Sequence, residues 1–309
     1  MKSGSEQLER FLEAGWVMRI LVAALAVYLL LSVIFGIFWS SEPEPFLVSE
    51  VAAQHAQQNN STVTTGYTTT VALMTVTQTL LDKSGGYLSN DVFPPGAWLD
   101  NIPRWEFGVL VQVRDLSRAM RKDFSRSQSQ STEDLDLSIA EPQFHFDSNS
   151  WALPDTEGEY RRGIDKLNAY VLRLADTNSG QSQFYARSDN LRQWLKDVET
   201  RLGSLSQRLS ASVGQKRINI DLAGDAAAQQ STENEGEFEV KTPWLEIDDV
   251  FYEARGTAWA LIHFLKAMEV DFADVLHKKN ALVSVKQIVR ELEATQQSIW
   301  APMILNGDG

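Results

Sequence analysis

The first hydrophobic feature of the chain is a run of 20 residues over 20–39, ILVAALAVYLLLSVIFGIFW, without a single Asp, Glu, Lys or Arg. A helix of that length spans ~30 Å, which is the hydrocarbon thickness of a bilayer. A buried core helix of the same length would rarely be apolar around its whole circumference. The pattern therefore predicts a transmembrane helix over residues 20–39, with the lipid bilayer as its partner.

The flanks of this run indicate its fate and its orientation. A cleaved secretory signal has a shorter apolar region followed by a small-x-small site. The run ends instead in FWSSEP, which offers no such site, so we expect it to remain as an anchor. Three bases precede the run and the first base after it is Lys83. By the positive-inside rule, residues 1–19 form a cytoplasmic tail and the rest lies on the far side of the membrane.

Beyond the span, apolar residues recur at alternating steps of three and four, the spacing of helices that bury one face. Two such patterns, joined by a short polar connector that ends in Gly180, predict an antiparallel αα-hairpin over about 157–213 with a coiled-coil-like seam. Two further long helices are expected over about 246–276 and 281–303. A shorter helix is expected over Glu106–Phe124.

Other stretches carry weaker patterns. Residues 67–81 are crowded with Thr, a strand former, yet their apolar spacing favours a helix. Alternating residues on either side of 223–236 are compatible with a small β-hairpin near 217–241. Residues 40–66 form a polar stalk in this interpretation, and 125–150 and 223–236 are expected to be loops.

These elements predict a mainly α fold. One N-terminal transmembrane helix is followed by the stalk and by a helical-bundle-like periplasmic domain over residues 67–309, because neighbouring helices with such stripes bury them on each other.

Composition and charge then exclude several classes of function. Acids outnumber bases 41 to 28, which gives a net charge of −13. The first 19 residues hold three of each, so all of the net charge lies beyond them. A polyanion is normally bound by clustered Lys and Arg, so we expect no nucleic-acid partner. The chain has no Cys, which excludes thiol nucleophiles, disulfides, iron–sulfur clusters and Cys-type zinc sites.

The motif search finds no reaction centre. Neither Gly-x-Ser-x-Gly, Ser-x-x-Lys, a phosphate-binding loop nor a dinucleotide fingerprint is present. Of the four His residues only His263 and His277 share an expected helix, where they are ~21 Å apart along its axis, too far for a shared ion. Asp274 and His277 resemble half of a di-iron site, but no second half exists. We therefore expect no metal and no cofactor, and catalytic residues stay unknown.

The most unusual segment is 85–107, GGYLSNDVFPPGAWLDNIPRWEF, in which aromatic residues alternate with Pro, Gly and charged residues. Such a loop can bind a glycan, a peptide or a partner helix. It can equally be a plug that seals one end of the bundle. The candidate binding residues of this segment are Tyr87, Phe93, Trp98, Asp100, Arg104 and Trp105.

Long segments resemble a known group of proteins. They include GGYLSNDVFPPGAWLDN, QFYARSDNLRQWL and KTPWLEIDDVFYEARGTAWALIHFL. They are similar to an uncharacterised family of single-pass inner-membrane proteins of Gram-negative bacteria, whose domain has no known function. The resemblance implies an inner-membrane location and brings no activity, cofactor or site residue. Members of that family continue past the point where this chain ends, which leaves open whether a C-terminal helix is missing here.

Three functions are compatible with these observations. The favoured hypothesis is a non-enzymatic envelope scaffold or interaction module, which binds another envelope protein or a second copy of itself. The alternative is a cell-wall or lipid hydrolase or lyase that uses carboxylates near residues 85–107. A sensor is disfavoured, because only 19 residues precede the span and no cytoplasmic output domain fits there.

Overall fold

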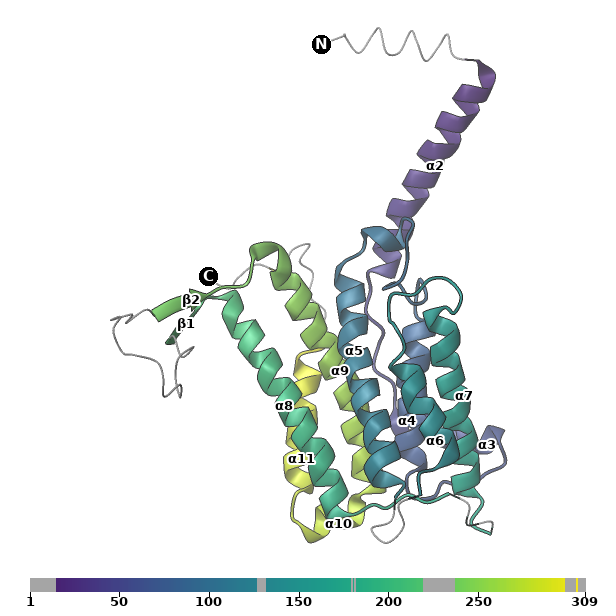
Figure 1. The fold of residues 1–309 in the computed structure, drawn as a ribbon, viewed down its shortest axis with the longest axis vertical. Coiled ribbons are helices and arrows are strands. Elements are labelled where there is room, and N and C mark those ends of the chain that lie inside the picture. Colours follow the sequence, from purple (N-terminus) through teal and green to yellow (C-terminus); the bar gives the residue numbers. More distant parts are fainter. Residues whose placement is uncertain are drawn as a thin grey trace, which may run out of the picture.

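The computed structural model describes residues 15–126, 132–178, 180, 182–218, 237–297 and 304. One long helix, α2 (Trp16–Trp39), projects from a bundle of helices (Figure 1). The mainly α fold class is confirmed. The remaining helices are α3 (Val48–Gln58), α4 (Tyr67–Asp82), α5 (Asn101–Ala119), α6 (Leu135–Phe144), α7 (Thr156–Ala175), α8 (Ser188–Ser212), α9 (Ile247–Asp271), α10 (Ala273–Lys278) and α11 (Leu282–Ala294).

Short elements complete the chain. Two 3₁₀ turns, η1 (Gly96–Trp98) and η3 (Trp244–Glu246), precede α5 and α9, and a π-helical turn, η2 (Met120–Phe124), extends α5. The β-hairpin expected near 217–241 is formed by β1 (Gln215–Ile218) and β2 (Glu237–Val240), which pair antiparallel. The expected loop 223–236 lies outside the described residues.

Helix α9 is the central element of the bundle. It packs against α5, α4, α11 and α8, and nearly every residue from 255 to 268 is buried. Its closest neighbour is α5, because glycines lie at the crossing. A Cβ atom on Gly256 would lie 2.0 Å from the carbonyl oxygen of Trp105, and one on Gly108 would lie 2.2 Å from that of Glu253. The two backbones therefore touch directly.

The Thr-rich stretch 67–81 is a helix, as expected. The hydrogen bonds of its Thr hydroxyls explain how a polar sequence forms a buried helix. The hydroxyls of Thr70, Thr75, Thr77 and Thr79 each donate to the carbonyl four residues earlier. These four hydroxyls are thus paired within the helix itself. The buried hydroxyl of Thr69 is paired outside the helix and donates to Asp271 of α9 at 2.7 Å.

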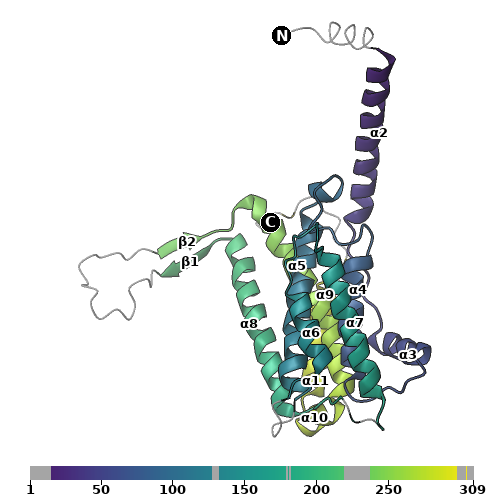
Figure 2. The same cartoon turned by 45° about the vertical axis from the view of Figure 1, so that its right-hand side comes forward.

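The expected αα-hairpin over 157–213 is wrong as a packed pair. Both helices form, but α7 packs against α6 and α4, whereas α8 packs against α9 and α5. Figures 1 and 2 show the two helices on different sides of the bundle. The stripe of each helix meets another partner, because the chain before α8 is tied to the end of η2, where the N–H of Tyr185 donates to the carbonyl of Phe124 at 2.6 Å.

The expected stalk over 40–66 is also wrong. Helix α3 buries Val48, Ala52 and Ala56 and packs against α4. His55 of α3 bonds to the hydroxyl of Tyr67 at 2.8 Å and to Oδ1 of Asn168 in α7 at 3.0 Å. The segment reads as polar because only every fourth residue of one short helix is buried.

Three other boundaries differ from expectation. The helix expected over 246–276 is interrupted after Asp271, where Phe272 leaves the helical conformation and packs against other aromatic rings. The helix expected over 281–303 ends at Ala294, and beyond it the carbonyls of Thr295 and Gln297 accept hydrogen bonds from Arg255, whereas residues 298–303 lie outside the described part of the chain. The expected loop 125–150 contains α6, whose N-terminus is capped by Asp134.

Candidate functional site beside the apolar helix

The aromatic segment 85–107 divides into a buried half and an exposed half. Tyr87 and Trp105 are 3% and 0% exposed, whereas Phe93 and Trp98 are 72% and 53% exposed. The two interpretations of this segment, plug and surface, therefore apply to different residues within it.

The buried half is held by Glu106 of α5. Its carboxylate accepts hydrogen bonds from the backbone N–H groups of Leu88 and Ser89, each at 2.9 Å. Nζ of Lys83, on the chain leaving α4, lies 2.6 Å from the same carboxylate, and both side chains are almost fully buried. A buried carboxylate with a cation and backbone donors is a structural clamp, because all of its acceptor positions are occupied.

Trp105 belongs to an aromatic column that crosses the core. Its ring meets that of Trp259 edge-on, with centroids 5.2 Å apart. The Trp259 ring lies 4.3 Å from the ring of His263, and His263 stacks on Phe46 at 3.9 Å. This column links α5 and α9 to the segment that leaves α2.

The two charged candidates of the segment also have structural partners. Asp100 caps the N-terminus of α5 by accepting from the backbone N–H of Asn101 at 2.9 Å. Nη2 of Arg104 lies 2.9 Å from Oδ2 of Asp249, which opens α9. Neither side chain is brought to Phe93 or Trp98 by these contacts.

The exposed half is a loop that lies against α2. The hydroxyl of Tyr28 donates to the carbonyl of Pro94 at 2.7 Å. Gly36 of α2 faces Pro95 and Leu99, since a Cβ atom built on it would lie 3.7 and 3.9 Å from their side chains. Both figures of the fold show η1 beside the end of α2 that joins the bundle.

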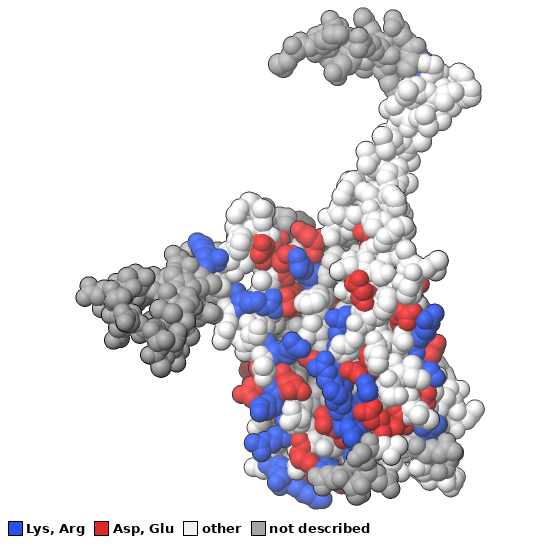
Figure 3. All heavy atoms as spheres, in the orientation of Figure 1, with Lys and Arg blue, Asp and Glu red and all other residues white. Residues whose placement is uncertain are grey.

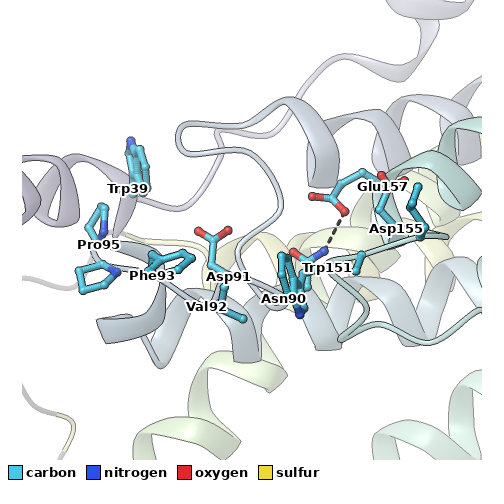
Figure 4. A pocket seen from close by; sticks show the side chains of 12 residues that line it. Trp39, Asn90, Asp91, Val92, Phe93, Pro95, Trp151, Asp155 and Glu157 are labelled. Atoms are coloured by element: carbon cyan, nitrogen blue, oxygen red, sulfur yellow. Dashed lines mark hydrogen bonds between the residues drawn. The ribbon is translucent and has the colours of Figure 1, made fainter.

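A pocket of about 660 Å³ opens between this loop and the loop that precedes α7 (Figure 4). Trp39 and Phe93 line one end, and Asp155 and Glu157 the other. Burial raises the pKa of Asp91 above its usual value, and the negative charges of Glu106 and Glu157 raise it further. The positive charge of Lys83 acts in the opposite direction. Sequence reasoning missed the second side of this pocket, including Trp151, because nothing in the local pattern of 145–157 relates it to 91–95.

The arrangement does not form the carboxylate centre expected of a hydrolase. The segment 85–107 contains three acids, Asp91, Asp100 and Glu106, of which Glu106 is buried against Lys83 and Asp100 caps a helix. Asp91 is the one that lines the pocket. Within the described ranges, no three His, Asp or Glu side chains are grouped so that they could hold a metal ion.

A second concave surface lies at the opposite end of the bundle. It is a groove of about 450 Å³ between α8 and the α10–α11 turn, with Leu191, Leu195, Leu276 and Val285 in its apolar wall. Its rim is basic, although the protein is acidic: Arg192, Lys196 and Lys279 line it together with one acid, Glu199. Figure 3 shows Lys and Arg side chains gathered at this end of the molecule.

The model of a bacterial protein family, DUF2333, described as an uncharacterised protein conserved in bacteria, matches residues 12–309. The chain belongs to this family. The match to DUF2333 includes α2 as well as the bundle, and it confirms the expected resemblance to an uncharacterised bacterial family. No curated protein and no solved structure matches the sequence. Among the described residues α2 is the one helix long and apolar enough to cross a membrane.

Proposed function

We propose that this protein is a single-pass inner-membrane protein of Gram-negative bacteria, with its N-terminus in the cytoplasm and its bundle in the periplasm. The bundle is a non-enzymatic interaction module that binds another envelope protein. The proposal is supported by the apolar surface of α2, the bases that precede it and the way in which α2 is joined to the bundle.

The observation that carries the proposal is the rigid connection between anchor and bundle. Glu42, three residues after α2, forms two 2.6 Å hydrogen bonds with Arg255 of the central helix. The backbone N–H of Phe46 donates to Nε2 of His263 at 3.0 Å. Because the connection is tied to α9 at two points, the bundle presents its surface at a fixed height above the membrane, which suits a module that meets a partner in the envelope.

The groove between α8 and the α10–α11 turn is the proposed partner surface. Its apolar wall accepts the apolar face of a helix, and its basic rim selects a partner with acidic flanks. It lies at the end of the bundle remote from α2 (Figures 1 and 3), where a partner in the periplasm reaches it without obstruction by the membrane.

Orientation is tested by cysteine labelling, which the absence of native Cys makes clean. The single variants Ser5→Cys and Ser210→Cys are expressed in cells. Spheroplasts prepared from these cells are treated with a membrane-impermeant maleimide before or after lysis. We expect Ser210→Cys to react in intact spheroplasts and Ser5→Cys to react only after lysis. The reverse pattern overturns the proposed topology.

Partner binding is tested in cells with a photo-crosslinking residue at position 192 on the groove rim. We expect a discrete crosslinked envelope protein, which disappears when Lys196→Glu and Lys279→Glu reverse the rim charge. The control pair Lys286→Glu and Arg290→Glu changes the same number of charges on exposed positions of α11 that do not line the groove. Loss of the crosslink in the control pair as well would refute the groove as the site.

The second candidate function is that of a hydrolase or lyase acting on cell-wall or lipid material. It is favoured only by Asp91 in the open pocket. The full-length protein is assayed on peptidoglycan and phospholipid, with Asp91→Asn and, as the matched control, Asp82→Asn at an exposed acid of α4. Turnover that is lost in Asp91→Asn and kept in Asp82→Asn would replace the binding module by an enzyme.

A further inference from the structure

We propose that the loop Val92–Leu99 is inserted into the periplasmic leaflet of the bilayer beside α2, as a second membrane contact that fixes the height and tilt of the bundle. This inference rests on the proposed function, because it requires α2 to span the membrane.

The position of the loop along α2 gives its depth. Tyr28, whose hydroxyl binds the carbonyl of Pro94, precedes the last residue of α2, Trp39, by 11 positions. At ~1.5 Å per residue the backbone of Tyr28 lies ~16 Å from that end of the helix, and Gly36, which faces Pro95 and Leu99, lies about 4.5 Å from it. The loop therefore meets α2 between these two levels, within the outer half of a ~30 Å hydrocarbon core. Ser32 lies between these two levels and is buried, although its neighbours on α2 are exposed. A loop that contacts α2 at this level cannot stay outside the bilayer that α2 crosses.

Three N–H groups and four carbonyls of the loop are hydrogen-bonded within the protein, which lowers the cost of leaving water. In hydrocarbon every unpaired N–H or C=O group costs several kcal/mol. The N–H groups of Ala97, Trp98 and Leu99 donate to the carbonyls of Phe93, Pro95 and Gly96 at 3.0–3.1 Å. Pro94 and Pro95 have no N–H, and the carbonyl of Pro94 accepts from Tyr28. Four successive carbonyls, 93 to 96, are therefore paired, which an ordinary solvent-exposed loop does not need.

The side chains of the loop fit acyl chains. VFPPGAWL, residues 92–99, contains no charged or hydrogen-bonding group except the indole N–H, and Asp91 and Asp100 bound it on both sides. Val92, Phe93 and Trp98 are 49%, 72% and 53% exposed, so their apolar surface is not used inside the protein. A protein-docking surface would surround such anchors with a polar rim. Here one side of the loop lies on α2, which is itself apolar and exposed, and the acidic residues Asp155 and Glu157 line only the far end of the adjoining pocket.

A neighbouring loop extends this apolar surface to the edge of the bundle. Trp151 and Leu153 line the same pocket as Phe93 and are 63% and 99% exposed. Trp is enriched where a protein meets the headgroup region of a bilayer, because its ring is apolar and its N–H is polar. We assign Trp151 to that level and Phe93 to the deeper one.

The test measures contact with lipid directly. Full-length single-cysteine variants at Phe93, Trp98, Leu30 and Val270 are labelled with an environment-sensitive fluorophore. They are then reconstituted in vesicles of phosphatidylethanolamine and phosphatidylglycerol with or without spin-labelled acyl chains. Leu30 is an exposed position of α2, and Val270 is an exposed position at the opposite end of the bundle. We expect quenching at Phe93 and Trp98 to equal that at Leu30 and to exceed that at Val270 several-fold.

The controls separate the two proposals. Quenching at Leu30 without quenching at Phe93 or Trp98 overturns the inserted loop and leaves the anchor intact. Absence of quenching at Leu30 itself shows that α2 is not in the bilayer and refutes the proposed function together with the inserted loop. All four positions are exposed on the protein surface, so the substitutions leave the core unchanged.

Discussion

The backbone N–H of Phe46 donates to Nε2 of His263, and the two rings stack with centroids 3.9 Å apart. Nδ1 of His263 donates to the carbonyl of Trp259 at 2.7 Å, because a carbonyl can only accept. Both nitrogens are thus committed, and the imidazole is neutral with its proton on Nδ1. The first segment after the anchor is therefore joined to the central helix by a group that protonation would disrupt.

This contact predicts a pH-dependent stability. Burial lowers the pKa of His263 from 6.5 to about 4 in the folded protein, with the Trp259 carbonyl acting against the shift. Between these values the unfolded chain binds the proton and the folded chain does not, so the stabilisation is complete above pH 6.5 and is lost as pH falls towards 4. We expect the free energy of unfolding to fall by up to ~1.4 kcal/mol per pH unit in this range. Urea titrations of the full-length protein in detergent measure it.

The variant His263→Gln removes this titrating group and should flatten that part of the pH profile. His277→Gln at an exposed helix end is the control and should leave the profile as in the wild type. If the unfolding free energy of His263→Gln depends on pH as that of the wild type does, the assignment of this pH dependence to His263 is contradicted.

The ion pair between Glu42 and Arg255 predicts a large asymmetry between two arginine substitutions. The side chains of Arg255 and Glu42 are 7% and 15% exposed, so Arg255→Ala leaves a carboxylate with little solvent and no cation. We expect a loss of about 3 to 5 kcal/mol in unfolding free energy. Arg161→Ala, whose pair with Asp82 is more than half exposed on both sides, should cost less than about 1 kcal/mol. Equal losses in the two variants would exclude the connection as the cause.

The contact between α5 and α9 predicts opposite effects for two glycine substitutions. A Cβ atom on Gly256 would lie 2.0 Å from the carbonyl of Trp105, so Gly256→Ala must separate the two helices and should cost about 3 kcal/mol or more. Nothing lies within 4 Å of a Cβ atom on Gly203 of α8. Gly203→Ala should stabilise the protein by about 0.5 to 1 kcal/mol, since it removes backbone freedom from the unfolded chain. Denaturant unfolding measures both effects: the midpoint should fall in Gly256→Ala and rise in Gly203→Ala relative to the wild type.

The aromatic segment predicts a contrast between its two tryptophans. Trp105 is 0% exposed and packs on Trp259, so Trp105→Ala should destabilise the protein by about 3 to 5 kcal/mol. Trp98 is 53% exposed, and Trp98→Ala should change the stability in detergent by less than about 1 kcal/mol. Thermal unfolding of the two variants shows which tryptophan is part of the core and which lies on the surface. A binding experiment therefore has to use Trp98 and leave Trp105 in place.

Several parts of the fold follow from local sequence. The helices predicted over 67–81 and over Glu106–Phe124 from apolar spacing are present as α4 and as α5 with η2, although α5 begins five residues earlier, at Asn101. The aromatic segment was singled out by its composition, and four of its six candidate residues, Phe93, Trp98, Asp100 and Arg104, lie on the surface. The two buried candidates, Tyr87 and Trp105, could not be separated from the exposed aromatic residues, because their side chains resemble those of Phe93 and Trp98 and only their neighbours in space differ.

Spacing along the chain was enough to locate α2, α4, α5, α7, α8 and α9, because the period of a helix and the cost of exposing apolar side chains act within a few turns. Pairing of these helices was decided only by the tertiary structure. The stripe on α7 fits any apolar partner, and α8 was the nearest of the helices predicted from the sequence, yet the packed partners are α6 and α4. The contacts of Phe46 with His263 and of Tyr28 with Pro94 join residues 217 and 66 positions apart. No local pattern marks such contacts, because each depends on the packing of the whole bundle.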